Sequence, residues 1–206
     1  RTQVLGGSYV RCDHCGHEQI SYHSCRDRHC PQCQWRATQQ WCDKQSQSLL
    51  PVTYYHLVFT LPHELNAWVA LYPQVIYKQL FKAVWQTLKT FASDPKRLDG
   101  QLGASLVLHT WGQQLWRHVH LHGLVPGGAL SDQGDWHSAS STYLFPVRAL
   151  SRYFRGAMVS ALRQCQKQRE LIRLAAEDMD RTLNVLMDKD WELCSEVDKS
   201  LSMYCW

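Results

Sequence analysis

The chain has 206 residues, of which 45% are hydrophobic and 19% charged, values typical of a folded, soluble protein with one good core. No apolar run reaches the roughly 18 residues that cross a bilayer, so a membrane-spanning helix is excluded. The formal net charge is +4, but residues 147–173 hold seven Arg or Lys against one acid, whereas residues 174–206 hold three bases against eight acids. The basic segment predicts either a surface that faces phosphates or an ordinary solvated helix face.

Residues 1–45 are rich in Cys, His and Arg and poor in aliphatic side chains, so we expect them to need a metal in order to fold. Six of the nine cysteines lie within residues 12–42. A secreted disulfide scaffold would spread its cysteines along the chain, so this clustering beside histidines indicates metal binding in a reducing compartment. The chain opens on Arg1 without an initiating Met or a signal peptide, and we expect it to be a fragment whose start is missing.

Two C-x-x-C knuckles, separated by fourteen residues, predict a structural tetrahedral Zn²⁺ site. Four thiolates would leave no coordination position open, so this zinc would stabilise the fold rather than catalyse a reaction. A disulfide pair and reactive thiols are the alternatives to a metal site. The predicted ligands are Cys12, Cys15, Cys30 and Cys33, and the nearby Cys25, His29, His14 and His17 are candidates to replace one of them or to form a second site.

Residues 52–62 are rich in β-branched and aromatic side chains and end at Pro62, which predicts a buried strand. Apolar residues then follow helical spacing from His63 to Phe91. Pro73 is expected to break this run and to begin a second helix in its first turn.

Residues 103–112 and 118–126 are predicted strands, and the short link between them favours an antiparallel hairpin. A turn or loop is expected over residues 126–136, and an amphipathic helix from Pro146. The fold class expected is therefore α+β, with an antiparallel sheet flanked by helices and preceded by the zinc module.

Three histidines, His118, His120 and His122, alternate along the third predicted strand. Residues i and i+2 of a strand point to the same face, about 6.7 Å apart, so two neighbouring imidazoles can hold one divalent ion. Three in line are too far apart for all of them to bind one ion without a bend. The alternative is a polar strand face with solvated histidines, but the Pro-Gly-Gly turn and the basic helix that follow make it weaker.

Several blocks, in this order, resemble the insertion-sequence ninety-one family of transposases, which are single-strand, rolling-circle enzymes of the HUH endonuclease class. The resemblance extends over roughly residues 1–190, and blocks in a shared order are more specific than any one motif. They are CRDRHCPQCQ at 25–34, LLPVTYYHLVFTLPHEL at 49–65, VLHTWGQQL at 107–115, HVHLHGLVPGG at 118–128 and LFPVRALSRYFR at 144–155.

This resemblance implies a divalent ion, Mg²⁺ or Mn²⁺, held by His120 and His122 beside a scissile phosphate of single-stranded DNA. It makes His118 a supporting residue and leaves Gln113, His109 and His56 as candidates for a third ligand. It also implies DNA contacts by arginines, with tryptophans available for stacking, in a bacterial cytoplasmic protein associated with the nucleoid. These are Arg26, Arg28 and Arg36 with Trp35 and Trp41, and the basic segment adds Arg148, Arg152 and Arg155 as candidate DNA contacts.

The family's nucleophiles are two tyrosines four residues apart, and no such pair exists in these 206 residues. We therefore expect a zinc-binding domain at 1–45, an incomplete HUH transposase domain at 46–190 and a divergent tail at 191–206, in which Tyr204 is not a nucleophile. The expected function is that of a rolling-circle transposase whose chain here holds the metal half of the site. The alternatives are a non-catalytic zinc-dependent DNA-binding protein and a zinc-ribbon adaptor for a protein partner.

Overall fold

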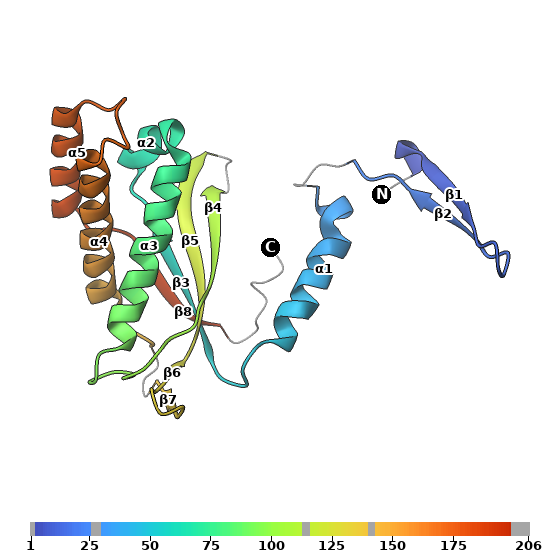
Figure 1. Ribbon diagram of the computed structural model, residues 1–206, viewed down its shortest axis with the longest axis horizontal. Coiled ribbons are helices and arrows are strands. Elements are labelled where there is room, and N and C mark those ends of the chain that lie inside the picture. The colour runs from blue at the N-terminus through green and yellow to red at the C-terminus, as the bar shows by residue number, and fades with distance from the viewer. Residues whose placement is uncertain (1–2, 26–29, 113–115, 140–142, 199–206) are drawn as a thin grey trace. The chain divides into compact units, whose positions relative to one another are not determined.

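The computed structural model describes residues 3–25, 30–112, 116–139 and 143–198 (Figure 1). The chain divides into two compact units, one formed by residues 1–50 with 200–206 and the other by residues 51–199. The division after residue 50 lies close to the expected boundary between the zinc-binding domain and the transposase domain. Within the described residues, no helix is long and apolar enough to span a membrane.

The first unit holds almost no hydrophobic core. A short 3-10 helix, Gln3–Leu5, precedes an antiparallel hairpin of β1 (Gly7–Arg11) and β2 (Glu18–Tyr22), and helix α1 covers Pro31–Gln47. Among the described residues of this unit, Cys42 is the one buried side chain. A unit with so little apolar burial depends on another source of folding free energy, as a metal-dependent module does.

The second unit is built on a four-stranded antiparallel sheet in the order β4-β5-β3-β8 (Figure 1). The strands are β3 (Tyr54–Thr60), β4 (Ser105–Trp111), β5 (Arg117–Pro126) and β8 (Leu193–Asp198). The three predicted strands and the β4–β5 hairpin are confirmed. Strand β8 comes from the segment that the sequence sets apart as a divergent tail, and it pairs with β3.

In the described part of the second unit, four helices accompany this sheet. They are α2 (Asn66–Leu71), which follows a 3-10 turn at His63–Leu65, α3 (Pro73–Ala92), α4 (Val147–Lys167) and α5 (Ala176–Asp188). Pro73 stands at the start of α3, as predicted, because proline lacks the N–H that a helix interior needs and loses nothing in the first turn.

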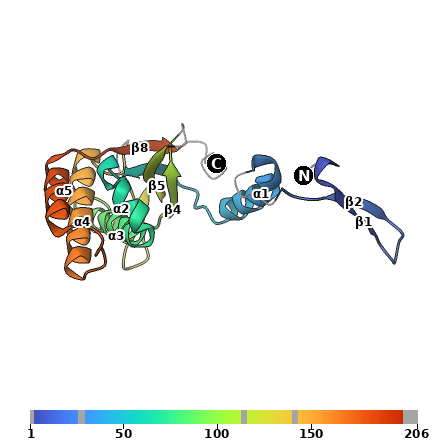
Figure 2. The same cartoon turned by 90° about the horizontal axis from the view of Figure 1, so that it is seen from above.

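The helices cover one face of the sheet (Figure 2). Leu57 and Phe59 of β3 and Leu121 of β5 are fully buried on that side, and the Phe59 ring meets the edge of Phe154 of α4 at 5.1 Å. Because side chains alternate along a strand, the even-numbered residues of β3 and the histidines of β5 point to the opposite face, which we call the open face.

A small hairpin of β6 (Gly128–Leu130) and β7 (Trp136–Ser138) follows β5. The turn predicted over residues 126–136 is therefore confirmed, but the prediction missed the two short strands on either side of it. A Cβ at Gly128 would come within 2.5 Å of the His137 carbonyl oxygen and of the Trp136 ring, so only glycine allows this close pairing.

Candidate metal centres

Three histidines gather on the open face. His109 of β4 and His120 and His122 of β5 each bring one ring nitrogen within 4.8 Å of the other two. The His109 ring lies 4.3 Å from that of His122 and 5.3 Å from that of His120, centroid to centroid. Such a cluster of three imidazoles from two adjacent strands has the composition of a divalent transition-metal site.

Strand pairing explains why His109 joins the group. It lies directly opposite His120 in the β4–β5 ladder, and cross-strand partners share a face of the sheet. His118 lies two residues before His120 on β5 and does not belong to this group. Gln113, another candidate ligand, lies outside the described residues.

Hydrogen bonds place the protons of His120 and His122. The Nδ1–H of His120 donates to the carbonyl oxygen of His118 at 2.9 Å, since a carbonyl can only accept, and Nε2 of His120 is left with its lone pair. Nδ1 of His122 lies 2.8 Å from Nε2 of His56 on β3.

The proton in the His122–His56 hydrogen bond belongs on His122. Nε2 of His122 is buried and has no hydrogen-bond partner among the described residues. If His56 donated, this atom would be an N–H donor buried without an acceptor, which is costly. If His122 Nδ1–H donates, Nε2 is a lone pair directed into the cluster, as in a metal ligand whose other nitrogen is held by a neighbouring acceptor.

Burial keeps these imidazoles neutral. It lowers the pKa of His122 to about 4, aided by the proximity of His109, His120 and His56. Burial likewise lowers the pKa of His109 and His120. A metal binds the neutral imidazole, so at neutral pH all three side chains are in the form that can bind an ion.

A second cluster lies in the first unit, where the Sγ atoms of Cys25, Cys30 and Cys33 lie within 4.8 Å of one another. Cys12 and Cys15 of the other predicted knuckle lie in the connection between β1 and β2, where the Cys12 N–H donates to the His17 carbonyl at 2.8 Å. The structure thus groups Cys30 and Cys33 with Cys25, a residue predicted as a supporting ligand. His29 lies outside the described residues.

Backbone donors stabilise thiolates in both knuckles. The Cys25 N–H lies 3.4 Å from Sγ of Cys33, and this contact is the main cause that lowers the pKa of Cys33 to about 6. Backbone N–H groups of Cys15 and His14 lower the pKa of Cys12. A thiolate is the form that binds zinc, so both knuckles are prepared for a metal.

The predicted DNA-contacting arginines differ in their surroundings. Arg36 on α1 and Arg148 and Arg152 on α4 are exposed. Arg155 instead donates to the Lys189 carbonyl oxygen at 2.6 Å and lies 3.8 Å from an Asp190 oxygen, so it links α4 to the end of α5. Arg26 and Arg28 lie outside the described residues, and the exposed Trp35 and Trp41 lie on α1.

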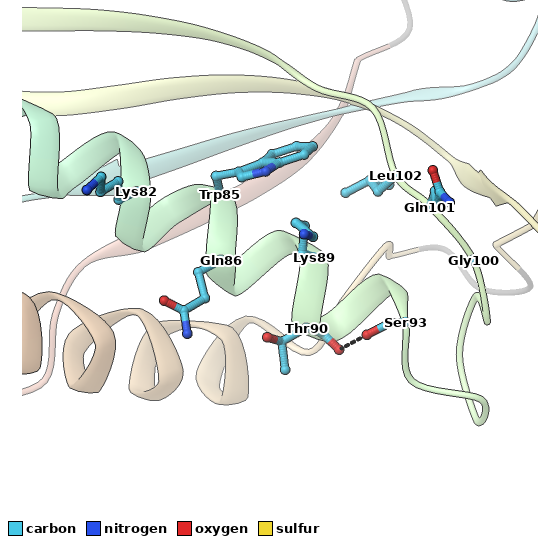
Figure 3. A pocket seen from close by; sticks show the side chains of 9 residues that line it. All are labelled: Lys82, Trp85, Gln86, Lys89, Thr90, Ser93, Gly100, Gln101 and Leu102. Carbon is cyan, nitrogen blue, oxygen red and sulfur yellow. Dashed lines mark hydrogen bonds between the residues drawn. The ribbon is translucent and has the colours of Figure 1, made fainter.

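A groove of about 840 Å³ runs beside α3 (Figure 3). Lys82, Trp85 and Lys89 of α3 line it together with Leu102, which precedes β4. It includes none of the clustered histidines or cysteines, so the groove is separate from both candidate metal centres.

Comparison with known proteins gives matches at both ends of the chain. Residues 1–61 match the family described as "Transposase zinc-binding domain", and residues 103–201 match the family described as "Putative transposase". The transposase for insertion sequence element IS801 of Pseudomonas savastanoi pv. phaseolicola is 34% identical over 142 residues, which are 68% of this chain and 33% of that protein. The chain belongs to the insertion-sequence ninety-one family of transposases.

A second relative, "Putative transposase y4qJ" of Sinorhizobium fredii (strain NBRC 101917 / NGR234), is 47% identical over 156 residues, or 75% of this chain and 39% of the relative. The chain thus spans between a third and two fifths of the length of these relatives. Among solved structures, the conjugative relaxase TrwC with a 27-mer DNA aligns with 53% of this chain and 44% of that chain at 18% identity and a TM-score of 0.43. The metal-bound structure of TrwC with its oriT DNA aligns with 54% of this chain and 43% of that chain, at 16% identity and a TM-score of 0.42.

Proposed function

We propose that the second unit is the metal-binding half of an HUH site that acts on the phosphodiester backbone of single-stranded DNA, within a rolling-circle transposase. The observation that supports this most directly is the His109–His120–His122 cluster on the open face, with the buried Nε2 of His122 unpaired. Membership of the transposase family supports the choice of DNA as substrate.

The ion held by these residues would polarise the scissile phosphate and offset the charge that develops on it. His120 and His122 each present Nε2, because the Nδ1–H groups are engaged by the His118 carbonyl and by His56. His109 is the proposed third ligand, in place of Gln113. The three imidazoles would thus hold the ion, and its remaining coordination positions would be available to water or to phosphate oxygens.

The type of ligand atom influences which ion binds at the histidine cluster. Mg²⁺ prefers oxygen ligands, whereas imidazole nitrogens suit first-row transition ions. Of the two expected ions, three neutral imidazoles therefore favour Mn²⁺ over Mg²⁺. In the first unit we propose a structural Zn²⁺ bound by Cys25, Cys30 and Cys33 with a fourth ligand from the same unit, where Cys12, Cys15 and His29 are the candidates.

The metal assignment is tested by Mn²⁺ titration of the whole chain, followed by calorimetry. We expect His109→Ala, His120→Ala and His122→Ala each to weaken binding at least tenfold, while His63→Ala, an exposed control, leaves it unchanged. If His109→Ala keeps its Mn²⁺ affinity and Gln113→Ala loses it, the third ligand is Gln113 rather than His109. Unchanged affinity in all three histidine variants would refute the site.

We propose further that this chain binds single-stranded DNA without forming a covalent adduct, because it lacks the paired tyrosines. A labelled oligonucleotide that carries a transposon end is incubated with the chain and Mn²⁺ and run on a denaturing gel. No shifted band is expected. A covalent band that disappears in Tyr204→Phe would contradict the proposal.

A zinc-ribbon adaptor would not bind single-stranded DNA in a salt-dependent manner, whereas both DNA-binding alternatives predict an affinity that falls steeply as salt rises. A titration at two salt concentrations therefore separates the classes. Salt-dependent DNA binding without a covalent adduct would favour a non-catalytic DNA-binding protein over an enzyme.

A further inference from the structure

Two tryptophans extend the histidine cluster across the open face. Trp111 follows His109 on β4, and its ring stacks on that histidine at 5.9 Å with an interplanar angle of 11°. Trp116 precedes β5 and stacks on His118 at 6.4 Å and 18°. His118 in turn lies 4.9 Å from His120, so the aromatic rings form a row from each tryptophan to the predicted metal ligands.

The core does not account for these two side chains. Trp111 is 45% exposed and Trp116 is 65% exposed, on the face of the sheet that the helices do not cover. Large aromatic rings left in water contribute little to folding, and a group of them marks a surface that binds something. Val107, which lies opposite His122 on the open face, is 43% exposed.

Trp116 is nevertheless held in place. A Cβ at position 112 would lie 2.1 Å from Nε1 and 2.6 Å from Cδ1 of Trp116, so the indole packs against the backbone of Gly112 in space that only glycine leaves. The Gly112 N–H also donates to the Trp116 carbonyl at 2.9 Å. The ring is therefore oriented before any ligand arrives, which reduces the entropy lost on binding.

We propose that Trp111 and Trp116 form a stacking platform for unpaired bases of single-stranded DNA, next to the phosphate that an ion at His109, His120 and His122 would polarise. This proposal rests on the proposed function and names a substrate contact of the same site. Nucleobases have flat π-faces that stack on indole rings, and such stacking tolerates any base sequence. The platform lies beside the candidate phosphate site and continues the same face, so one strand can occupy both.

Stacking on indole and ionic attraction to phosphates differ in their response to salt, because indole carries no charge. Removal of a ring should therefore weaken binding without changing how the affinity depends on salt, because that dependence counts contacts between cations and phosphates. The salt dependence of the affinity therefore distinguishes the tryptophans from the exposed arginines of α4, because loss of an arginine would make the affinity less dependent on salt.

The experiment measures the affinity of the whole chain for a fluorescent oligo-dT by anisotropy at two salt concentrations. We expect Trp116→Ala and Trp111→Ala to weaken binding roughly 5- to 150-fold each, with an unchanged salt slope. Trp116→Phe should keep most of the affinity, while Trp116→Leu, which is apolar but not aromatic, should lose it. Trp85→Ala is the matched control, because Trp85 is 38% exposed and lies in the groove beside α3 (Figure 3).

Gly112→Ala supplies a second variant, in which the Trp116 ring must move while every aromatic group remains. It should weaken oligo-dT binding, and circular dichroism should show the fold retained in all variants. Three results would overturn the platform: equal loss in Trp85→Ala, full affinity in Trp116→Leu, or equal binding of single-stranded and duplex DNA.

Mn²⁺ affinity of the same variants distinguishes this failure from failure of the metal site. If tryptophan variants bind oligo-dT normally while histidine variants lose Mn²⁺, the platform is wrong and the metal site stands. If histidine variants bind Mn²⁺ normally while tryptophan variants lose oligo-dT, the metal site is wrong and the platform stands.

Discussion

His56 is the residue whose position gives most information about the candidate metal centre, because it accepts the Nδ1–H of His122 without belonging to the cluster itself. Loss of such a partner commonly lowers metal affinity by about 10- to 100-fold. We expect that loss in His56→Phe, which keeps a ring but has no acceptor, and partial recovery in His56→Gln, whose amide oxygen can accept. Calorimetry with Mn²⁺ measures both.

The same variant has a readout without metal. In the metal-free protein, nitrogen NMR should show the His122 proton on Nδ1, and in His56→Phe it should move toward Nε2. A wild-type protein with the proton on Nε2 would contradict the assigned hydrogen bond.

The lowered pKa of His122 predicts a pH-dependent stability. Its ordinary value is 6.5 and burial lowers it to about 4, so between these two values the unfolded chain binds a proton that the folded chain does not. Linkage then makes the free energy of unfolding fall as the pH drops from about 6.5 to 4 and leaves it level above that window. Urea unfolding of chelator-treated protein across pH 4 to 8 measures it, and His122→Asn should flatten the dependence whereas His63→Ala should not.

The two faces of the sheet should differ sharply in how they tolerate truncation of side chains. Leu121 on β5 is fully buried under the helices, whereas Val107 on β4 is 43% exposed on the open face. We expect Leu121→Ala to reduce the free energy of unfolding by about 2 to 5 kcal/mol, since it leaves a cavity. Val107→Ala should cost less than about 1 kcal/mol. Similar losses for both variants in denaturant unfolding would mean that the open face is covered.

The two units should respond differently to the loss of zinc. Apart from Cys42, no described side chain of the first unit is buried, whereas the second unit has an extensive core. Chelation should therefore unfold residues 1–50 and leave the sheet intact, with amide exchange rising in α1 but not in α3. Preservation of both units after complete zinc release would contradict this prediction.

Cysteine variants identify the zinc ligands. Cys33→Ser should lower the zinc content, and Cys194→Ser, an exposed cysteine on β8, should not. A loss in Cys12→Ser with full zinc in Cys25→Ser would restore the four ligands that the two knuckles predict. A loss in Cys25→Ser supports the observed cluster.

The sequence by itself determined the features that depend on neighbours along the chain. Alternation in β5 places His118, His120 and His122 on one side, Pro73 separates two helices, and the short link closes the β4–β5 hairpin. Each follows from backbone geometry that acts over a few residues, so the pattern of residue types is sufficient. The sequence blocks that resemble the transposase family added the prediction of metal-dependent chemistry on DNA.

Only the tertiary structure decided which residues meet. His109 joins the cluster because it lies opposite His120, and His56 reaches His122 because β3 and β5 are adjacent. The short strands β6 and β7 and the edge position of β8 depend equally on pairing, and Arg155 donates to a carbonyl 34 residues away. Register and contact across the sheet are set by long-range packing and hydrogen bonding, and no local spacing of residues encodes them.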